Sequence, residues 1–444
     1  MGKLFFVLTT LAFVGGGSYL IRAVQGRPTA LELLPLVWAY DRFVYDGILN
    51  YHLALGLCLL TIGYLHRATD NARRVPSRFS MAVLACLGVL TYFSHILGWV
   101  PLCLAIAVYS ALLCLRERSW RGMLPMLSLL PSTLLLVWYV ASRSGGISWV
   151  LYPSLTAKLY AWAPAFLLFF RLDPLGLQPP MALVLNVGVW AVMAGMVIGF
   201  ADRGQRASPG DLFHAAPLLS ALSCLACAAL IPFYLFANMG RPDVRFLQPA
   251  MWLAIASVRY RKPSGGQTAA PVLLVMLVLA VNLVQFARAS PQLVEVFEAL
   301  HRAVPKDTRV YSVSLRSPPL SLSEAVEDSG LINFTVGMPI LDYFDLYRFI
   351  AHGGYTADLG MFGIAWLANS PTAPPPQLRL ATLSNRDLRA TAAAIRTQAG
   401  QFDIVELFGQ SSDVRAVEAY VAPALVPVAS GTHYSVLAPV AGSR

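Results

Sequence analysis

Polar side chains stand in front of apolar runs at two places in this chain. The segment DGILNYHLALGLCLL starts at Asp46 and carries Asn50 and His52 before a run typical of a membrane helix. Further along, TYFSHILGWV places His95 in a similar setting. Carboxylate, amide and imidazole groups can bind charged ligands and move protons. Each is costly to place in lipid without a partner, so the elements that hold them decide what they do.

The composition indicates a polytopic membrane protein. Hydrophobic residues make up 57% of the chain and charged residues 13%, with a mean hydropathy of +0.60, whereas an ordinary soluble domain is about 25% charged. The formal net charge of +10 suggests a nucleic-acid partner at first. The basic residues, however, cluster in short loops between apolar runs, which is the positive-inside pattern. We therefore expect a lipid bilayer as partner, and no nucleic acid.

Nine apolar runs are candidate spans. They cover approximately residues 4–21, 47–65, 80–97, 98–115, 122–141, 181–200, 213–236, 246–258 and 270–288. The basic residues of the alternate loops are Arg67, Arg73, Arg74, Arg78, Arg116, Arg118, Arg121, Arg203, Arg206, Arg259, Arg261 and Lys262. If every run crosses once, all these loops face the cytoplasm. The sequence thus predicts a multi-pass protein of the cell inner (plasma) membrane, with a cytoplasmic N-terminus and an extracytoplasmic C-terminal domain.

Four of these runs are ambiguous. Residues 80–115 are too long for one helix and rather short for two, and Gly98 and Pro101 offer a break for the hairpin that the flanking arginine loops require. The run 246–258 is shorter than about twenty residues, so it is either tilted into protein or re-entrant. The first run is compatible with a signal peptide, but it lacks an A-x-A-like cleavage site, and we interpret it as an uncleaved span.

On this topology the polar residues of the spans lie near the outer surface. Asp46 is at the outer mouth of the second span, and Asn50 lies one turn deeper on the same face. His52 is on a neighbouring face, and His95 comes near the outer end of the third span. Polar groups cost less there than at the bilayer centre. Two interpretations remain open: hydrogen bonds between packed helices, or the lip of an outward-facing cavity.

Two predicted outer loops also carry charge. The first contains Glu32 and Asp41, and the last short one contains Arg241 and Arg245. Positive charge outside runs against the positive-inside bias. The two arginines are therefore either snorkelling or ion-paired residues, or a cationic clamp on a lipid phosphate, which guanidinium groups match in geometry.

An aromatic segment lies between these loops. Residues 147–170 (ISWVLYPSLTAKLYAWAPAFLLFF) contain Pro153 and Pro164, which argue against a straight span. We interpret the segment as amphipathic and lying on the outer surface. It either roofs a cavity for a lipid chain or serves as an interfacial anchor.

The chain divides into a transmembrane domain, residues 1–289, and an extracytoplasmic α/β domain, residues 290–444. The hydrophobic pattern of the second part indicates alternating helices and strands. The predicted elements are helices at 293–301 and 385–397 and strands at 309–315, 402–408 and 433–437.

The cysteines do not indicate a metal site. All six lie in apolar runs. Cys224 and Cys227 have C-x-x-C spacing, but no second cysteine pair and no nearby histidine accompanies them, so we interpret them as buried small hydrophobic residues. A Gly-rich nucleotide loop is also missing. We therefore expect no metal and no cofactor.

Three short motifs resemble the bacterial multi-spanning GT-C-type glycosyltransferases. The segment FVYDGILNYHLALGL, from Phe43, resembles a G-F-L-N-Y-like element before a glycine-containing span in that superfamily. YFSHILG, from Tyr92, resembles the S-H element that follows it, and RFLQP, from Arg245, resembles an R-F-L-x-P element before a late span. The likeness covers most of the membrane region, and an outward C-terminal α/β domain fits it.

The resemblance implies a polyprenyl-phosphate-linked sugar as donor and transfer on the extracytoplasmic face. It implies that an acid of the first outer loop, here Asp46, Asp41 or Glu32, acts as base on the acceptor hydroxyl, while arginines hold the departing phosphate. The expected phosphate- or substrate-binding residues are Arg241, Arg245, His95, Asn50 and His52.

The chain also departs from that family, because relatives usually have more spans before the N-Y-H-like element. Either the chain is an N-terminally shortened form without the catalytic acid, or one of the three acids substitutes. The alternative function is a non-catalytic multi-spanning protein: a transporter, or an assembly partner in envelope polysaccharide export. A transporter favours internal repeats and midplane charges; the sequence shows no repeat and few charges inside spans, which favours the transferase.

Overall fold

The computed structural model describes the helices of the chain and a sheet near its C-terminus. The described residues are 2–39, 49–70, 76–142, 150–151, 158–159, 162, 166, 168, 179–202, 215–231, 234–235, 243–261, 265–304, 308–315, 355–356, 387–399, 402–408, 411–422, 424–431 and 434–440. The chain splits into two compact units. Unit 1 is Met1–Phe169 with Leu183–Asn282, and unit 2 is Phe170–Ala182 with Leu283–Arg444.

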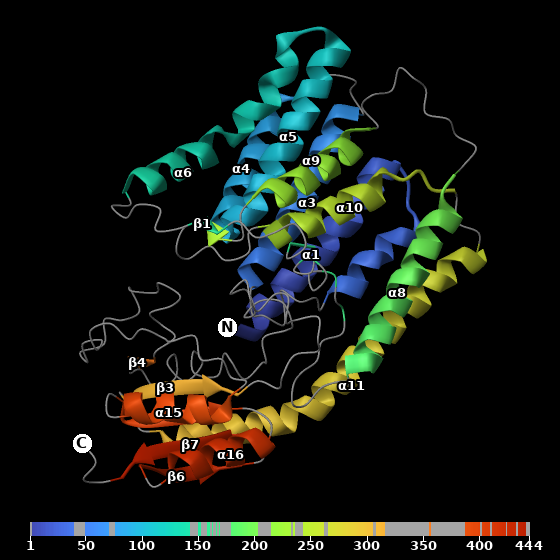
Figure 1. Ribbon diagram of the computed structural model, residues 1–444. Coiled ribbons are helices and arrows are strands. Elements are labelled where there is room, and N and C mark those ends of the chain that lie inside the picture. Colours follow the sequence, from blue (N-terminus) through green and yellow to red (C-terminus); the bar gives the residue numbers. More distant parts are fainter. Residues whose placement is uncertain are drawn as a thin grey trace. The chain divides into compact units, whose positions relative to one another are not determined.

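Helices build unit 1 (Figure 1). The described α-helices are α1 (Gly2–Gln25), α3 (Leu49–Asp70), α4 (Arg78–Ser94), α5 (Ile96–Glu117), α6 (Leu130–Ser142), α8 (Pro179–Phe200), α9 (Ala216–Leu230), α10 (Leu247–Ser257) and α11 (Gly265–Ala303), which continues into unit 2. The described 3-10 helices are η1 (Ala30–Trp38), η2 (Trp120–Leu129) and η5 (Asp243–Phe246). A short strand, β1 (Val150–Leu151), pairs antiparallel with β2 (Tyr234–Leu235). Each of the nine apolar runs overlaps a helix.

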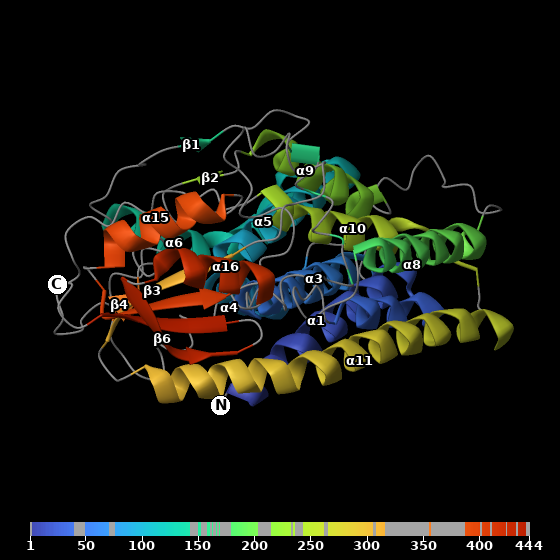
Figure 2. The ribbon, with the colours of Figure 1, turned by 60° about the horizontal axis from the view of Figure 1, so that its bottom comes forward.

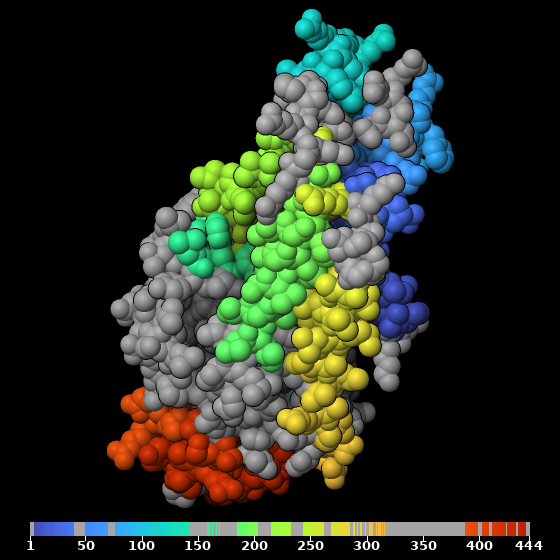
Figure 3. All heavy atoms as spheres, turned by 90° about the vertical axis from the view of Figure 1, so that its right-hand side faces the viewer, coloured from blue at the N-terminus to red at the C-terminus, as the bar shows by residue number. Residues whose placement is uncertain are grey.

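Three helical segments of the described part are long and apolar enough to cross a membrane: Leu4–Gln25, Ile96–Glu117 and Trp120–Ala141. Shorter apolar helices are Arg78–Ser94, Val184–Phe200, Ala216–Leu230 and Thr268–Val284. Helix α8 and the first part of α11, green and yellow in Figure 3, expose many valine and leucine side chains. A broad apolar surface of this kind suits lipid better than water.

Helices α1 and α3 run in the same direction. The ring centroids of Phe13 and His52 lie 4.3 Å apart, and further along both helices the backbone of Leu20 lies beside Gly63. The residue numbers therefore rise together along the pair.

Glycines allow the backbones of α1 and α3 to approach closely. A Cβ atom placed on Gly16 would lie 2.1 Å from the carbonyl oxygen of Gly56, and one on Gly56 would lie 2.5 Å from the backbone of Ala12. No side chain fits at such distances, so the contact requires glycine on both helices.

Helix α5 is also parallel to α3. Gly98 lies against Ala54 near the start of both helices, and the Nδ1 atom of His66 lies 2.9 Å from the Tyr109 hydroxyl near their ends. Helices α1, α3 and α5 therefore begin at one end of unit 1 and finish at the other.

Helix α10 follows the same direction. The rings of Phe13 and Trp252 are 6.0 Å apart, and Gln25, the last residue of α1, donates from Nε2 to the carbonyl oxygens of Ala256 and Val258 at 2.8 and 2.7 Å. We call the end at which α1, α3, α5 and α10 begin the helix-start end.

The expectation that the first two spans run in opposite directions is wrong for this structure, since α1 and α3 are parallel. The chain turns back along α1 through η1: Ser18 Oγ donates to the Glu32 carbonyl oxygen at 2.6 Å, and Gly17 lies against Pro35. The buried residues of η1 are Ala30, Leu31, Leu34, Pro35, Val37 and Trp38. This part of the predicted outer loop is therefore packed among helices.

The break in the run 80–115 lies at His95, not at Gly98 or Pro101. Helix α4 ends at Ser94 and α5 begins at Ile96, with extended backbone at His95 (φ −170°, ψ 128°). Pro101 lies within α5 without ending it. Gly98 instead permits close packing, because a Cβ there would lie 2.6 Å from that of Ala54.

Arginines gather where the parallel helices finish. Arg116 Nη2 donates to the Thr69 carbonyl oxygen at 3.4 Å, and Arg27 donates to the carbonyl oxygen of Tyr260. We call this the arginine end. Its arginines, at or just beyond the helix ends, are Arg22, Arg27, Arg67, Arg116, Arg118, Arg259 and Arg261. The described part therefore agrees with the predicted gathering of basic residues on one side.

Unit 2 contains a sheet of five described strands in the order β4–β3–β5–β7–β6 (Figure 2). They are β3 (Arg309–Ser314), β4 (Tyr355–Thr356), β5 (Ile404–Phe408), β6 (Leu425–Ser430) and β7 (Tyr434–Pro439). Strand β3 is parallel to β4 and β5, while β7 is antiparallel to β5 and β6. Helices α15 (Leu388–Ala399) and α16 (Ser411–Val421) share one apolar core with the sheet, and Val304, after α11, joins a second core. The pattern had indicated β3, β5, β7 and α15, but not β6 or α16.

The close contact of α1 with α3 makes a direct prediction. Gly56→Leu should lower the unfolding temperature of the detergent-purified protein, because overpacking costs about 1–3 kcal/mol and here the obstacle is backbone. Gly15→Leu is the matched control, since nothing lies within 4 Å of a Cβ at Gly15. Both changes gain roughly 0.5–1 kcal/mol of helix propensity. Equal unfolding temperatures for the two variants would contradict the packing described.

Candidate functional site

Two residues predicted from the sequence as site residues meet at the helix-start end. Nη1 of Arg245 lies 3.1 Å from Nε2 of His95, across 150 residues of chain. Arg245 belongs to η5, directly before α10, and His95 is the residue between α4 and α5. They meet because α10 and α5 begin at the same end of unit 1.

Tyr51 completes this arrangement from the first turn of α3. Its hydroxyl donates to the Arg245 carbonyl oxygen at 2.5 Å. The guanidinium carbon of Arg245 lies 5.5 Å from the centroid of the Tyr51 ring, and the same ring meets the His95 ring edge-on at 5.6 Å. Contact with the ring face attracts the cation and fixes its place. We call Tyr51, His95 and Arg245 the helix-start cluster.

His95 also begins α5. Its Nδ1 atom accepts the backbone N–H of Leu97 at 3.1 Å. Extended backbone followed by a side-chain acceptor is the usual geometry of a helix N-cap. The imidazole is therefore held by the helix that it starts, and its Nε2 edge is the one that faces Arg245.

A buried carboxylate lies in the same short helix as Arg245. Asp243 is fully buried, and its Oδ2 atom accepts the indole N–H of Trp162 at 2.9 Å. Burying a carboxylate is costly unless it is hydrogen-bonded or paired. The other acids in the described part of unit 1 are Glu32 beside α1, and Asp70, Glu117 and Asp202 at or just after the ends of α3, α5 and α8. Asp243 is thus the described acid of the helix-start end.

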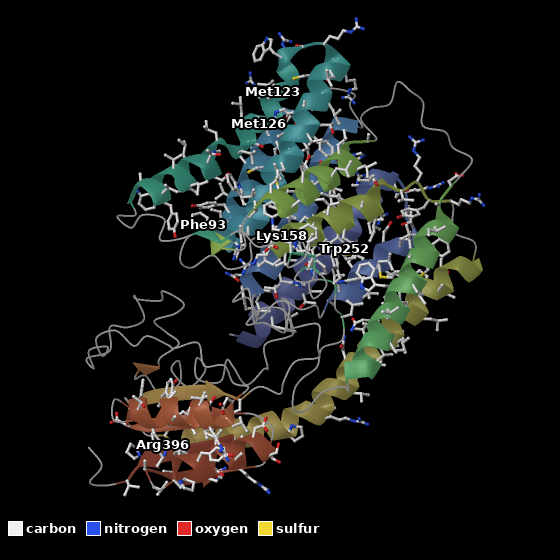
Figure 4. The ribbon with its side chains drawn as sticks, in the orientation of Figure 1. Phe93, Met123, Met126, Lys158, Trp252 and Arg396 are labelled. Atoms are coloured by element: carbon white, nitrogen blue, oxygen red, sulfur yellow. The ribbon has the colours of Figure 1, made fainter. Side chains whose placement is uncertain are left out.

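Lys158 holds the last turn of α9 (Figure 4). It is only 4% exposed, and its Nζ atom donates to the carbonyl oxygens of Ala228, Ala229 and Ile231 at 3.0, 2.5 and 2.5 Å. The last carbonyls of a helix have no partner within the helix, and a cation there also opposes the negative end of the helix dipole. Because Trp162 is four residues away and binds Asp243, the end of α9 lies near the helix-start end.

Asn50 and His52, two further predicted site residues, are not part of the helix-start cluster. Asn50 is exposed at the start of α3, where its Oδ1 atom accepts the N–H of Tyr51 at 2.9 Å. His52 is buried with its ring against Phe13, which places it at the contact of α3 with α1.

Glu32 is not brought to the helix-start cluster. Its Oε1 atom accepts the backbone N–H of Thr29 at 2.8 Å and so caps η1. The predicted residues Asp41, Asp46 and Arg241 lie outside the described part of the chain.

Sequence reasoning did not single out Tyr51, Asp243 or Lys158. Tyr51 follows Asn50 in the quoted motif, and Asp243 stands two residues before Arg245. Lys158 is a lone cation in the aromatic segment, which was interpreted as lying on the outer surface. The structure instead buries Lys158. Burial is possible because the helix end that the lysine caps gives its ammonium group three acceptors.

The cluster suits the binding of an anion. A guanidinium group donates several N–H bonds in a fixed plane, and charge-assisted bonds gain strength away from bulk water. Among the described residues no group of His, Cys, Asp and Glu side chains is arranged to hold a metal ion. All six cysteines are free thiols.

The role of Lys158 can be measured by stability. Lys158→Met should lower the unfolding temperature, because it leaves buried carbonyl oxygens without a donor, at roughly 1–3 kcal/mol for each unsatisfied group. Arg121→Met, at an exposed position of η2, is the control and should leave the temperature within about one degree. A Lys158→Met protein as stable as the control would show that the lysine does not hold α9.

Known proteins give no counterpart for this chain. No protein-family model, curated protein or solved structure matches it. The functional argument therefore rests on the residues at the helix-start end.

Proposed function

We propose that this protein is a multi-pass membrane protein that binds a polyprenyl-phosphate-linked sugar at its helix-start end and transfers the sugar on the extracytoplasmic face. The observation that carries the proposal is the contact of Arg245 with His95 over Tyr51. These residues lie at the end of unit 1 opposite the arginines that favour the cytoplasm.

The orientation follows from charge and helix direction. The arginine end should face the cytoplasm, so α1, α3, α5 and α10 run inward and the N-terminus lies outside. Segment η1 then begins the return from α1 towards α3. Nine 3-10 residues span about 18 Å, and irregular backbone is tolerated at membrane depth where protein covers it. Helix α11 starts after the arginine end, so unit 2 follows as an extracytoplasmic α/β domain.

The cluster supports phosphate binding for three reasons. Arg245 supplies a permanent cation, and guanidinium matches phosphate in shape. Tyr51 fixes that cation through its ring and through the Arg245 backbone. His95 adds a ring nitrogen at the same point. A phosphate attached to a lipid reaches such a site from the membrane without losing contact with the bilayer.

Transfer requires a base as well as a phosphate site. A carboxylate takes the proton of the acceptor hydroxyl as that oxygen bonds to the anomeric carbon. The bond from the sugar to the phosphate oxygen breaks, and the lipid phosphate leaves with the electron pair, stabilised by Arg245. Among the described residues we propose Asp243 for this step, because it is the acid of the helix-start end; Asp41 and Asp46, which the family resemblance suggests, stay predictions.

The full burial of Asp243 favours a second candidate, a lipid-phosphate-binding protein that does no chemistry. In that case the carboxylate anchors Trp162 and takes no proton from a substrate. The two candidates differ in turnover: only the first converts a sugar-bearing polyprenyl phosphate to free polyprenyl phosphate.

The orientation can be tested by labelling. In a variant with all six cysteines replaced by alanine, Lys3→Cys should react with a membrane-impermeant maleimide added to intact cells. Arg118→Cys should react only after permeabilisation, because it lies at the arginine end. Protection of Lys3→Cys in intact cells would contradict the parallel arrangement of α1 and α3 in the membrane.

Phosphate binding can be tested at Arg245. Wild-type protein in phosphatidylcholine nanodiscs should bind undecaprenyl phosphate more tightly than undecaprenol. Arg245→Gln should weaken phosphate binding about 10- to 100-fold, since a charged hydrogen bond contributes about 1.5–3 kcal/mol. Arg121→Gln, at an exposed position of η2, should bind as wild type does. Unchanged affinity in Arg245→Gln would remove the basis of the proposed function.

A further inference from the structure

The arginines of the arginine end differ in what their side chains contact. Arg27 and Arg116 donate to carbonyl oxygens at the ends of other elements, and Arg261 lies 3.9 Å from the carboxylate of Asp202. These contacts join neighbouring segments of the chain. Arg118, directly after α5, is exposed, and its guanidinium group takes part in none of the described hydrogen bonds or ion pairs. Its side chain therefore does not hold the helix ends together.

Arg118 also stands where glycine would suit the backbone better. Among the described residues it is the non-glycine residue with a positive φ, at φ 50° and ψ 36°. A Cβ atom is unfavourable in this left-handed conformation, whereas glycine adopts it freely and is the usual residue at such a helix end. The chain thus keeps a long cationic side chain at a cost to its fold. An observed backbone outlier of this kind points to a function outside the fold.

Arg121 lies close to Arg118 in the chain and is also exposed, at the start of η2. A Cβ atom on the next residue, Gly122, would lie 2.3 Å from the backbone nitrogen of Cys114, in the last turn of α5. The first turn of η2 is therefore held against the last turn of α5, where the arginine end begins.

Arg78 approaches the same end on another helix. Helix α4 ends at Ser94, directly before His95 at the helix-start end, and packs along α3 and η2 (Figure 1). A Cβ atom on Gly88 would lie 4.0 Å from the carbonyl oxygen of Ser128 in η2. Because α4 is about 25 Å long, its first residue, the exposed Arg78, lies toward the arginine end, as the start of η2 does.

Exposed aromatic side chains accompany these arginines. Phe79 follows Arg78 and is 76% exposed, and Trp120 lies between Arg118 and Arg121 and is 75% exposed. Large aromatic side chains are unfavourable in bulk water but are enriched where a membrane meets water. We call Arg78, Phe79, Arg118, Trp120 and Arg121 the arginine–aromatic patch.

The patch lies where apolar helices begin and end. The apolar segment Ile96–Glu117 ends one residue before Arg118, Trp120–Ala141 begins inside the patch, and the shorter apolar helix Arg78–Ser94 begins with it. Residues at the end of a membrane span lie at the depth of the lipid headgroups. The charges of the patch are therefore placed to meet headgroups rather than acyl chains.

We propose that the arginine–aromatic patch binds anionic phospholipid headgroups. Its three cations have no described carboxylate partner, and guanidinium matches phosphate in shape. A zwitterionic headgroup brings its own cation to each phosphate, so an anionic headgroup gains more from the patch. Leu115 and Leu127, before and after the patch in the chain, are exposed as well. An apolar surface beside the charges favours lipid over a soluble acidic protein as the partner.

The lipid preference can be measured by native mass spectrometry. The full-length protein is released from nanodiscs of equal phosphatidylglycerol and phosphatidylcholine, and the two lipids that stay bound are counted. Wild type should retain phosphatidylglycerol in excess. Arg118→Gly should lower the ratio about threefold to fivefold, as expected for one arginine at an anionic surface. Arg396→Gln removes an exposed cation from α15 in unit 2 (Figure 4) and, as the control, should keep the wild-type ratio.

Arg118→Gly also separates lipid binding from folding. Glycine relieves the positive φ, so the unfolding temperature in detergent should equal or exceed that of wild type. Arg78→Gln gives a second measurement on another helix and should lower the lipid ratio by a similar factor. Equal retention of the two lipids by wild type, or an unchanged ratio in both variants, would overturn the proposal. The arginines would then only anchor helix ends at the interface.

This proposal is independent of sugar transfer and fails or stands separately from it. Its readout is the retention of phosphatidylglycerol, whereas the test of Arg245 uses undecaprenyl phosphate in phosphatidylcholine. In those discs the patch meets few anionic headgroups, so Arg121→Gln remains a control there. Arg118→Gly should accordingly bind undecaprenyl phosphate as wild type does while its preference for phosphatidylglycerol falls.

Discussion

The arrangement at the helix-start end depends on the backbone contact between Gly16 and Gly56. Helices with larger residues at a crossing are held about 8–10 Å apart, and here a single Cβ would collide with a carbonyl oxygen. The contact brings α3 close against α1, and Gly98 likewise brings α5 close to Ala54 of α3. Tyr51 and His95 come shortly before these glycines in their helices. Glycine packing therefore determines the position along the helix axes at which the two side chains meet.

A parallel pair of neighbouring helices needs a third segment that returns the chain. In this protein η1 begins that return, with its apolar residues buried and Pro35 against Gly17. Glu32 serves this segment: its carboxylate accepts the Thr29 N–H, and its carbonyl oxygen accepts the Ser18 hydroxyl. Glu32, one of the three acids that the sequence offers for chemistry, is thus occupied in holding the fold. This use is consistent with the rule that irregular backbone within an apolar environment must have its polar groups satisfied.

The positions of the helices were predictable from hydropathy, and their directions were not. Apolar runs locate α1 and α3, but only the contacts of Phe13 with His52 and of Leu20 with Gly63 show that the two helices are parallel. The break at His95 was missed because glycine and proline are the usual break signals, whereas here the imidazole itself caps α5. His95 and Arg245 were predictable because each contradicts its surroundings, the first as a polar group in an apolar run and the second as positive charge away from the arginine end. Lys158 carried no comparable signal, since its acceptors belong to a helix about seventy residues away.

Helix η5 separates two opposite charges within one turn. A 3-10 helix has about three residues per turn, so the side chains of residues two apart point roughly 120° away from each other. Asp243 accordingly meets Trp162, and Arg245 meets His95 and Tyr51. Since the Tyr51 hydroxyl binds the Arg245 carbonyl oxygen, the backbone of the turn is tied to α3. That bond helps to fix the directions in which the Asp243 and Arg245 side chains leave the turn.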